Sequence, residues 1–452
     1  MKKLLIIAAL MMLAMPAFAA VQNVKVSGDI TTYGVGQYVF DLDDRSTDIE
    51  GGAGDEENFF ATITRLRVDA DLTDNVAATV RLVNEREWDT QYCSSGDTTD
   101  AIMDLAYITL KEIFYSPLTV MIGRQELAYG SKLVVGDPNT NAVKSSDSDL
   151  TNAPYLSKIK SFDAIRGVLD YDPWTIDLVY AKIDEAFEAA STEDEDILGI
   201  NFAYDFADYE AEAEGYFFYV DGDPEASYSS SEANIDGYVL GLRGSLAPVD
   251  GLTVGAEIAI QGGDYANGPA VTNRDLDAMA ATVEGSYVWD NEYAPMIKLC
   301  YDYRSGEKAG TSSGDYEAWL PLYEDQTKGL IADYLFSGAN AGVNSNSNII
   351  NLGGSFQPTE DLTIALDWFH YILDEKLTSS NDQSYSSWSP VGSVTIDSED
   401  DLGDEIDLAL IYDYTEDVVI GLQAGWFMPG DVFDATNNDD AYELLGSIAV
   451  SF

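Results

Sequence analysis

The stretch YELLGSIAVSF at 442–452 alternates apolar and polar side chains with a period of two. Successive side chains of a β-strand point to opposite faces, so Leu444 and Ile448 fall on one face while Glu443 and Ser447 fall on the other. A strand that separates lipid from a wet lumen requires this pattern. The stretch therefore predicts one wall strand of a membrane β-barrel, and its position makes it the expected closing strand.

A secretion signal is expected at 1–19. Lys2 and Lys3 precede an apolar run at 4–15, and 17–19 (Ala-Phe-Ala) supplies the small residues that a signal peptidase reads. The apolar run has 12 residues, fewer than the roughly 20 that a membrane-spanning helix needs. We therefore expect export to the outer membrane of a Gram-negative bacterium, with residues 20–452 forming a single barrel.

The charge of the chain excludes some partners. Eighty acidic and 23 basic residues give a net charge of −57, and such a surface does not bind nucleic acid or anionic lipid non-specifically. The 28 Tyr, 17 Phe and 7 Trp residues argue against disorder and suit the aromatic girdles of a membrane protein. Acidic clusters at 41–48, 193–196 and 397–404 are either solvated loops or weak divalent-cation sites, but none has EF-hand spacing. No metal or cofactor is predicted, and Cys93 and Cys300 suggest neither a metal site nor a disulfide.

Short turns and long connections alternate along the chain, and their count predicts the architecture. Eight short turns are expected at 73–75, 115–117, 172–173, 207–208, 248–251, 290–292, 358–361 and 415–417. Nine longer connections are expected at 41–58, 84–102, 125–161, 184–195, 221–233, 262–273, 306–347, 374–404 and 428–440. Together they predict an all-β, antiparallel up-and-down barrel of about 18 strands, with short periplasmic turns and long extracellular loops.

Two blocks of sequence resemble the alginate export family of outer-membrane barrels. The first is GRQELAYG at 123–130. The second extends from 403 through 412 to 426–431. The resemblance implies an eighteen-stranded barrel that acts as a channel, and the family's named member passes a polyuronate through a lumen lined by basic residues. This chain has Lys132 where members more often have Arg.

Alternation within the expected strands suggests which charged side chains point inward. The residues expected to line the lumen are Arg65, Arg67, Arg81, Arg124, Glu126, Arg166, Glu210, Glu212, Glu214, Arg243, Glu257, Lys298, Asp302 and Arg304. Such residues either select ions, because a narrow low-dielectric wall focuses the electric field, or pair across strands and stiffen the wall.

Three of these residues, Glu210, Glu212 and Glu214, are expected to form an acidic ladder on one face of a strand, for which we favour ion selection. Arg124 and Glu126 are interpreted either as a salt bridge that fixes the following loop or as a constriction pair. The two longest connections are expected to fold into the barrel mouth, because Trp319 and its neighbours are too apolar for a free loop.

The predicted function is an outer-membrane porin for passive transport of small hydrophilic solutes, with a preference for cations. The alternative is a dedicated export channel for an anionic polysaccharide such as alginate, and a third reading is a structural or adhesive barrel plugged by its loops. An enzyme is the rival class, but the single histidine, His370, has neither a G-x-S-x-G motif nor a second histidine to support it. Expected partners are outer-membrane lipid and lipopolysaccharide, the solute or polysaccharide, and the barrel insertion machinery, which would contact the strand ending at Phe452.

Overall fold

A computed structural model describes the chain over most of its length. The described residues are 23–42, 56–88, 101–114, 117–138, 150, 153–184, 195–222, 234–266, 274–308, 314–336, 343–376, 399–433 and 438–452. The expected signal at 1–19, Cys93 and most of the turn at 115–117 lie outside these residues.

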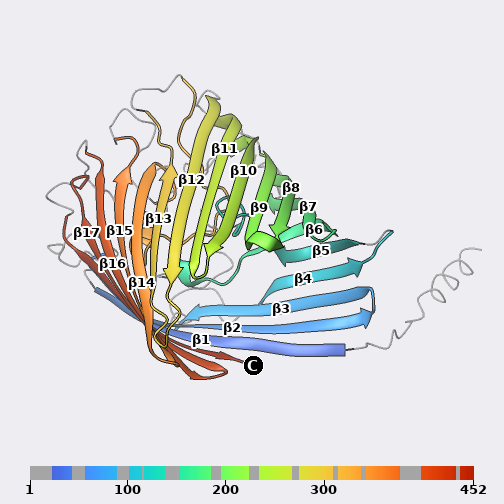
Figure 1. The fold of residues 1–452 in the computed structure, drawn as a ribbon, viewed down its shortest axis with the longest axis horizontal. Coiled ribbons are helices and arrows are strands. Elements are labelled where there is room, and N and C mark those ends of the chain that lie inside the picture. Colours follow the sequence, from blue (N-terminus) through green and yellow to red (C-terminus); the bar gives the residue numbers. More distant parts are fainter. Residues whose placement is uncertain are drawn as a thin grey trace, which may run out of the picture.

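Eighteen antiparallel strands form one closed sheet (Figure 1). They are β1 (Asn23–Tyr38), β2 (Glu56–Thr73), β3 (Val76–Glu87), β4 (Ile102–Lys111), β5 (Leu118–Glu126), β6 (Ser161–Asp170), β7 (Trp174–Asp184), β8 (Glu195–Phe206), β9 (Ala211–Asp221), β10 (Asn234–Val249), β11 (Leu252–Ala266), β12 (Arg274–Val288), β13 (Met296–Arg304), β14 (Ser347–Thr359), β15 (Leu362–Leu373), β16 (Asp401–Thr415), β17 (Val418–Pro429) and β18 (Ala441–Ser451). Each strand pairs with its neighbours in the chain, and β1 pairs with β18 to close the ring. The predicted fold class and strand number are confirmed.

Closure depends on the stretch that ends the chain. Val35 of β1 is paired with Leu445 of β18, and the backbone groups of Gly28 and Phe452 exchange hydrogen bonds of 2.9 and 3.0 Å. A closed sheet leaves no unpaired strand edge within the hydrocarbon layer, where an unsatisfied backbone group costs several kcal/mol. The aromatic terminal residue is thus part of the seam.

Strand joins follow the predicted alternation of short and long. The β10–β11 hairpin, for example, turns at Asp250 and Gly251, and Gly251 has φ +81°, a conformation that side chains other than glycine rarely adopt. A Cβ atom there would also lie 2.3 Å from the carbonyl oxygen of Val288. The strand ends that the long joins connect all lie at the opposite rim, since consecutive antiparallel strands reverse direction.

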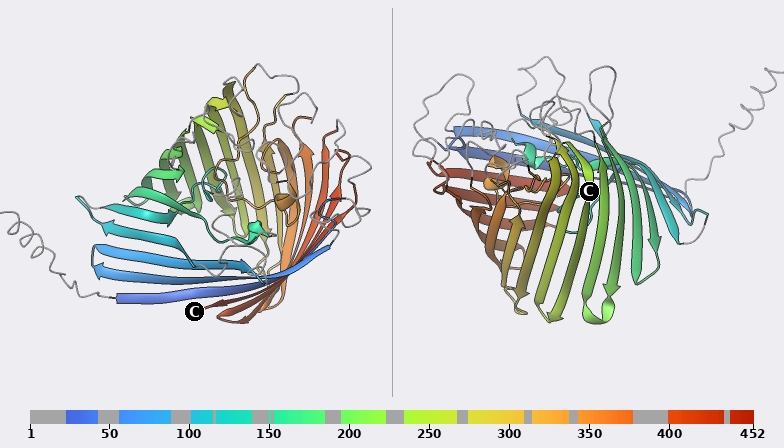
Figure 2. Two further views of the ribbon diagram at one scale, coloured as in Figure 1. Left: turned by 180° about the vertical axis from the view of Figure 1, so that it is seen from behind. Right: turned by 90° about the horizontal axis from the view of Figure 1, so that it is seen from above.

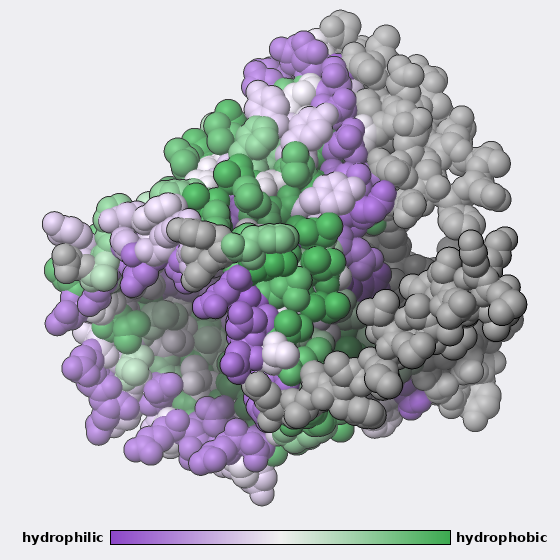
Figure 3. Space-filling view, turned by 90° about the vertical axis from the view of Figure 1, so that its right-hand side faces the viewer, coloured by the Kyte–Doolittle hydropathy of each residue, from purple (hydrophilic) through white to green (hydrophobic). Residues whose placement is uncertain are grey.

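The two faces of the wall differ as the alternation requires. On β11, Ile258 and Ile260 are 46% and 42% exposed on the exterior, whereas Glu257 and Gln261 are 4% and 3% exposed on the lumen side. Figure 3 shows apolar side chains gathered between hydrophilic ones on the exterior of the molecule. The exterior is therefore suited to lipid, and the polar side chains are turned inward.

Helical structure in the described residues is limited to short turns: η2 (Pro154–Leu156), η3 (Ala207–Tyr209) and α2 (Ala332–Leu335). No helix in this part of the chain is long and apolar enough to cross a membrane. Figure 2 shows α2 within the ring of strands. The interior of the barrel is thus occupied by connecting segments.

Candidate functional site

The described parts of two long connections lie in the lumen, as the sequence predicts. We call residues 127–160, between β5 and β6, the first infolded loop, and residues 305–346, between β13 and β14, the second infolded loop. Trp319 and Tyr323 of the second loop are 1% and 4% exposed, and they belong to a cluster with Val135 of the first loop and with the inward-facing wall residue Val239. Apolar packing therefore holds parts of both loops against the wall.

Wall carboxylates hold the second infolded loop by its backbone. The carboxylate of Glu405, on β16, accepts the N–H groups of Leu330, Ile331 and Ala332 at 2.7, 2.7 and 2.8 Å. The hydroxyl of Tyr371 donates to the carbonyl oxygen of Lys328 at 2.8 Å. Three backbone hydrogen bonds to one side chain therefore fix the loop where α2 begins.

The first infolded loop is held in the same way from the opposite wall. Glu214, on β9, accepts the N–H of Gly130 at 2.9 Å, and Glu257, on β11, accepts the N–H of Ser131 at 2.8 Å. Tyr216 donates its hydroxyl to Glu257 at 2.6 Å. Two residues that were predicted to line the pore therefore bind loop backbone.

A lysine cluster lies where the two infolded loops meet. Lys132 and Lys160 of the first loop both pair with Asp325 of the second, at 2.5 Å in the case of Lys132. Burial acts to raise the pKa of Asp325, but the two ammonium groups outweigh it and the pKa is lowered. Lys158 has no carboxylate within ion-pair distance among the described residues, and burial together with Arg65 lowers its pKa.

Several predicted residues do form pairs on the lumen side. Three of the partners lie on other strands and two lie in the second infolded loop, so the local sequence could not identify them. The contacts are Arg65 with Asp29 at 2.9 Å, Arg67 with Asp69 at 2.8 Å, Arg166 with Asp177, Lys298 with Asp367 at 2.8 Å, Asp302 with Lys328 at 2.8 Å, and Arg304 with Gln326 at 2.7 Å. These wall charges are thus bound across strands, along one strand or to the second infolded loop.

Arg81 lies at the centre of a three-strand contact. Its guanidinium group, 9% exposed, donates to Asp104 of β4 and, at 2.5 Å, to Glu126 of β5. Neither of the two interpretations of Arg124 and Glu126 anticipated this, since Glu126 pairs with Arg81 and not with Arg124. Asp104 was not among the predicted residues, although its side chain is fully buried.

Arg124 and Glu210 require correction. Arg124 pairs with Asp163 at 2.8 Å on the exterior, because two-residue alternation places it on the same face as Ile122, which is 44% exposed. Glu210 is not part of β9: it precedes the strand, in the β8–β9 turn, with φ +46°.

The predicted acidic ladder is therefore interrupted. Glu214 is bound to the first infolded loop, and Arg243 lies 3.5 Å from Glu212 and 4.0 Å from Glu214. Glu212, at 49% side-chain exposure, is the member of the ladder that remains open to solvent. Of the three glutamates, Glu210 lies in a turn, Glu214 binds the backbone of the first infolded loop, and Glu212 lies within ion-pair distance of Arg243.

His370 and Cys300 are two further residues that the sequence analysis considered. His370 stacks on Trp368 and lies 3.2 Å from Asp404 on the exterior. No group of three or more potential metal ligands comes together in the part of the chain that the structure describes, and Cys300 is a free cysteine. The charged lumen is accordingly the candidate site.

A family model for alginate export matches residues 43–446. This range includes nearly all of the barrel and both infolded loops. The chain belongs to the alginate export family. No curated relative matches its sequence at a significant level.

Proteins of known structure share the fold of this member of the alginate export family, although their sequence identity to it is low. The outer membrane protein OprD from Pseudomonas aeruginosa is 10% identical with a TM-score of 0.54, and the match covers 96% of each chain. OccK2 (OpdF) from the same organism is 13% identical with a TM-score of 0.56, covering 96% of this chain and 99% of that one. OccK2 has also been solved in complex with glucuronate, with the same identity, TM-score and coverage. These likenesses show a shared porin-like barrel.

Proposed function

We propose that this protein is a passive outer-membrane channel for small hydrophilic solutes, and that the lysine cluster selects solutes that carry a carboxylate. The observation that carries the proposal is the position of Lys132, Lys158 and Lys160 at the meeting point of the two infolded loops. A solute that crosses a barrel must pass the segments that fill its lumen, so their charges decide selectivity.

Local charge at this point differs from that of the whole chain. The three lysines and Arg65 face Asp29, Glu85 and Asp325, so cations outnumber carboxylates here in a protein of net charge −57. Several other wall carboxylates accept N–H groups of the loops or pair with wall cations, which reduces their effect on a passing ion. The complex of OccK2 with glucuronate adds support by fold analogy.

Cation preference is the second candidate. It is favoured by the exposed lumen-side carboxylate of Glu212 and by the net charge of the chain. Export of an anionic polysaccharide would also use the lysine cluster. It would, however, require the second infolded loop to leave the lumen, against the packing of Trp319 and the hydrogen bonds to Glu405.

Single-channel recording tests the proposal. The protein in a planar bilayer should show a current that glucuronate blocks and that glucose, an uncharged sugar of similar size, does not. Replacing Lys132, Lys158 and Lys160 with Gln should abolish the block and raise the cation/anion permeability ratio, whereas Glu212→Gln should lower that ratio slightly. A wild-type channel that strongly prefers cations and keeps its selectivity in the triple variant would exclude the lysine cluster as the selector. A block by polyuronate fragments only would favour export.

A further inference from the structure

The exterior of β5 to β8 changes from apolar to charged at a single level. On each strand the last exposed apolar or aromatic residue is followed, two positions nearer the outer rim, by a charged one. The pairs are Ile122 and Arg124, Ile165 and Asp163, Tyr180 and Lys182, and Leu198 and Asp196. Because outward residues on a strand are two apart, this step marks where the hydrocarbon layer ends and the headgroup layer begins.

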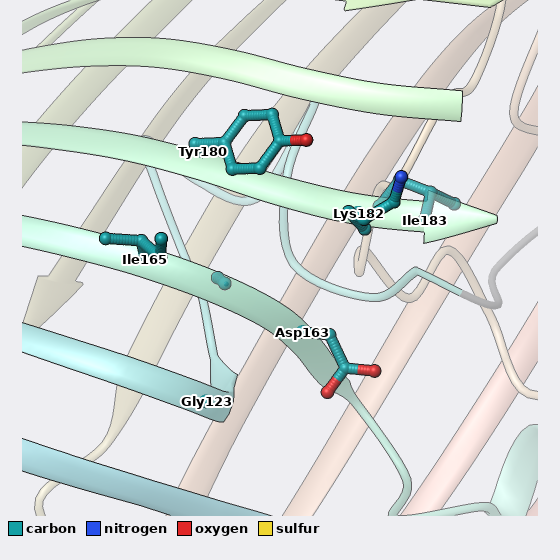
Figure 4. Close-up of a pocket in the computed structure, with 7 residues that line it drawn as sticks. Gly123, Asp163, Ile165, Tyr180, Lys182 and Ile183 are labelled. Atoms are coloured by element: carbon teal, nitrogen blue, oxygen red, sulfur yellow. The ribbon is translucent and has the colours of Figure 1, made fainter. Parts of the chain in front are cut away.

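A cavity of about 400 Å³ opens at this level. Its lining includes Gly123, Asp163, Ile165, Tyr180 and Lys182, from β5, β6 and β7 (Figure 4). Ile165 is 50% exposed and Tyr180 is 38% exposed, which places the cavity on the lipid-facing side of the sheet. Gly123 is the lining residue that β5 contributes. The cavity thus has an apolar and aromatic part beside a charged part.

The charged part is an exterior network of side chains. Arg124 donates two hydrogen bonds to Asp163, at 3.0 and 2.8 Å. Lys182 lies 3.7 Å from Asp196, which also accepts the hydroxyl of Tyr180 at 2.8 Å. Lys182 and Arg124 keep 33% and 38% side-chain exposure. Both cations are therefore accessible to a ligand in the headgroup layer.

Cations at this level are confined to one sector of the barrel. Among the described strand residues, the outward-facing cations near the outer rim are Arg86 on β3, Arg124 on β5 and Lys182 on β7. The corresponding ends of β9 to β12 present acidic residues outward, which are Asp221, Asp236, Asp264, Asp275 and Asp277. Asp163 and Asp196 offset part of the positive charge of the first sector, and the second sector presents carboxylates, so an anionic amphiphile would bind the first sector in preference to the second.

We propose that the cavity at β5 to β7 binds a phosphorylated glycolipid of the outer leaflet, of the lipid A type. Its acyl chains contact Ile165 and Ile122, its sugar packs on the ring of Tyr180, and a phosphate group binds Lys182 and Arg124. Tyrosine suits this level because it has an apolar ring and a polar tip. The proposal is independent of what passes through the lumen, so it can fail or hold without affecting the proposed channel.

Native mass spectrometry of the intact folded barrel tests the proposal, with bisphosphorylated lipid A, monophosphoryl lipid A and phosphatidylethanolamine as the probes. We expect one preferred site for the bisphosphorylated lipid and weaker binding of the other two. Lys182→Gln should weaken binding about fivefold, the effect of one basic residue near an anionic surface. Asp163→Asn should strengthen binding, because it removes the carboxylate that competes for Arg124.

Lys111→Gln is the matched control. Lys111 ends β4 at the periplasmic rim, so it lies in the same sector at the other side of the membrane, and its loss should leave binding unchanged. Folding of each variant is checked by its heat-dependent mobility in SDS. Equal binding of all three lipids would overturn the proposal, and so would equal losses in the Lys182 and Lys111 variants or no gain in the Asp163 variant.

Discussion

The carboxylate of Glu405, on the barrel wall, accepts the backbone N–H of Ala332, in the second infolded loop, at 2.8 Å. The same carboxylate accepts the N–H groups of Leu330 and Ile331. Glu405 thereby binds three backbone donors at the start of α2, and Asp407 of the same strand also accepts the N–H of Leu330 at 3.0 Å. These hydrogen bonds tie the loop to the wall, in addition to the apolar packing of Trp319 and Tyr323.

Replacing Glu405 with Gln should loosen the second infolded loop. Gln keeps one acceptor oxygen, but its NH₂ group would face N–H donors, and loss of a buried hydrogen bond to a charged group costs on the order of 2 kcal/mol. The single-channel current should then fluctuate between more levels than in the wild type. Glu416→Gln, in the exposed β16–β17 turn, is the control and should leave the current unchanged. A quiet current in the Glu405 variant would show that apolar packing alone holds the loop.

Local sequence patterns predicted the wall well. Strand phase at Glu257 and Ile258 follows from two-residue alternation, and the β10–β11 turn follows from Asp250 and Gly251. The exterior position of Arg124 could have been found in the same way, since it stands two residues after Ile122.

The role of Glu214 could not be predicted from its neighbours. Its partner, the N–H of Gly130, is 84 residues away and becomes adjacent only when the loop folds into the lumen. Lys158 and Lys160 offered a weak signal, as two cations at strand spacing just before β6, but Asp325 lies on the far loop. Long-range contacts within a closed barrel depend on the path of its loops, which alternation does not specify.

Arg81→Gln should lower the stability of the barrel. The change would leave the carboxylate of Asp104, which is 0% exposed, buried without its cation, and such a loss costs about 3–5 kcal/mol. Arg67→Gln on the adjacent strand is the matched control, because its pair with Asp69 is 37% and 34% exposed and contributes about 1 kcal/mol or less. The measurement is the temperature at which mobility in SDS shifts. Equal shifts for both variants would contradict a structural role specific to Arg81.

The second infolded loop should be less firmly seated at alkaline pH. Burial raises the pKa of Glu324 to about 8 and that of Asp333 to about 7, although Arg304 and Lys328 oppose the shift. In a released loop the two carboxyl groups would lose their protons at pH values near their ordinary pKa. Between that pH and about pH 8 the seated loop therefore binds more protons than the released loop. Seating is then strongest below the ordinary values and weakens as pH rises to about 8.

Current fluctuations should therefore increase between pH 5.5 and 9. The charged groups that face Glu324 are Asp333, Arg304 and Lys328, and Glu405 faces Asp333. We therefore assign the pH dependence of the current to this cluster. Glu324→Gln cannot ionise and should flatten the pH dependence, while Glu416→Gln should leave it intact. A pH profile that is the same in the wild type and the Glu324 variant would assign the dependence to other groups.

The short turns and the long connections should lie on opposite sides of the outer membrane. Asp74 is in the β2–β3 turn and Lys376 is in the β15–β16 connection, and both are exposed, so only the membrane should distinguish their accessibility. In a background with Cys93 and Cys300 replaced by Ser, a membrane-impermeant maleimide applied to intact cells should label Lys376→Cys and spare Asp74→Cys. Permeabilising the outer membrane should make both sites reactive, which controls for local accessibility. Because antiparallel strands fix all short turns on one rim, labelling of Asp74→Cys alone on intact cells would invert the orientation of the entire barrel.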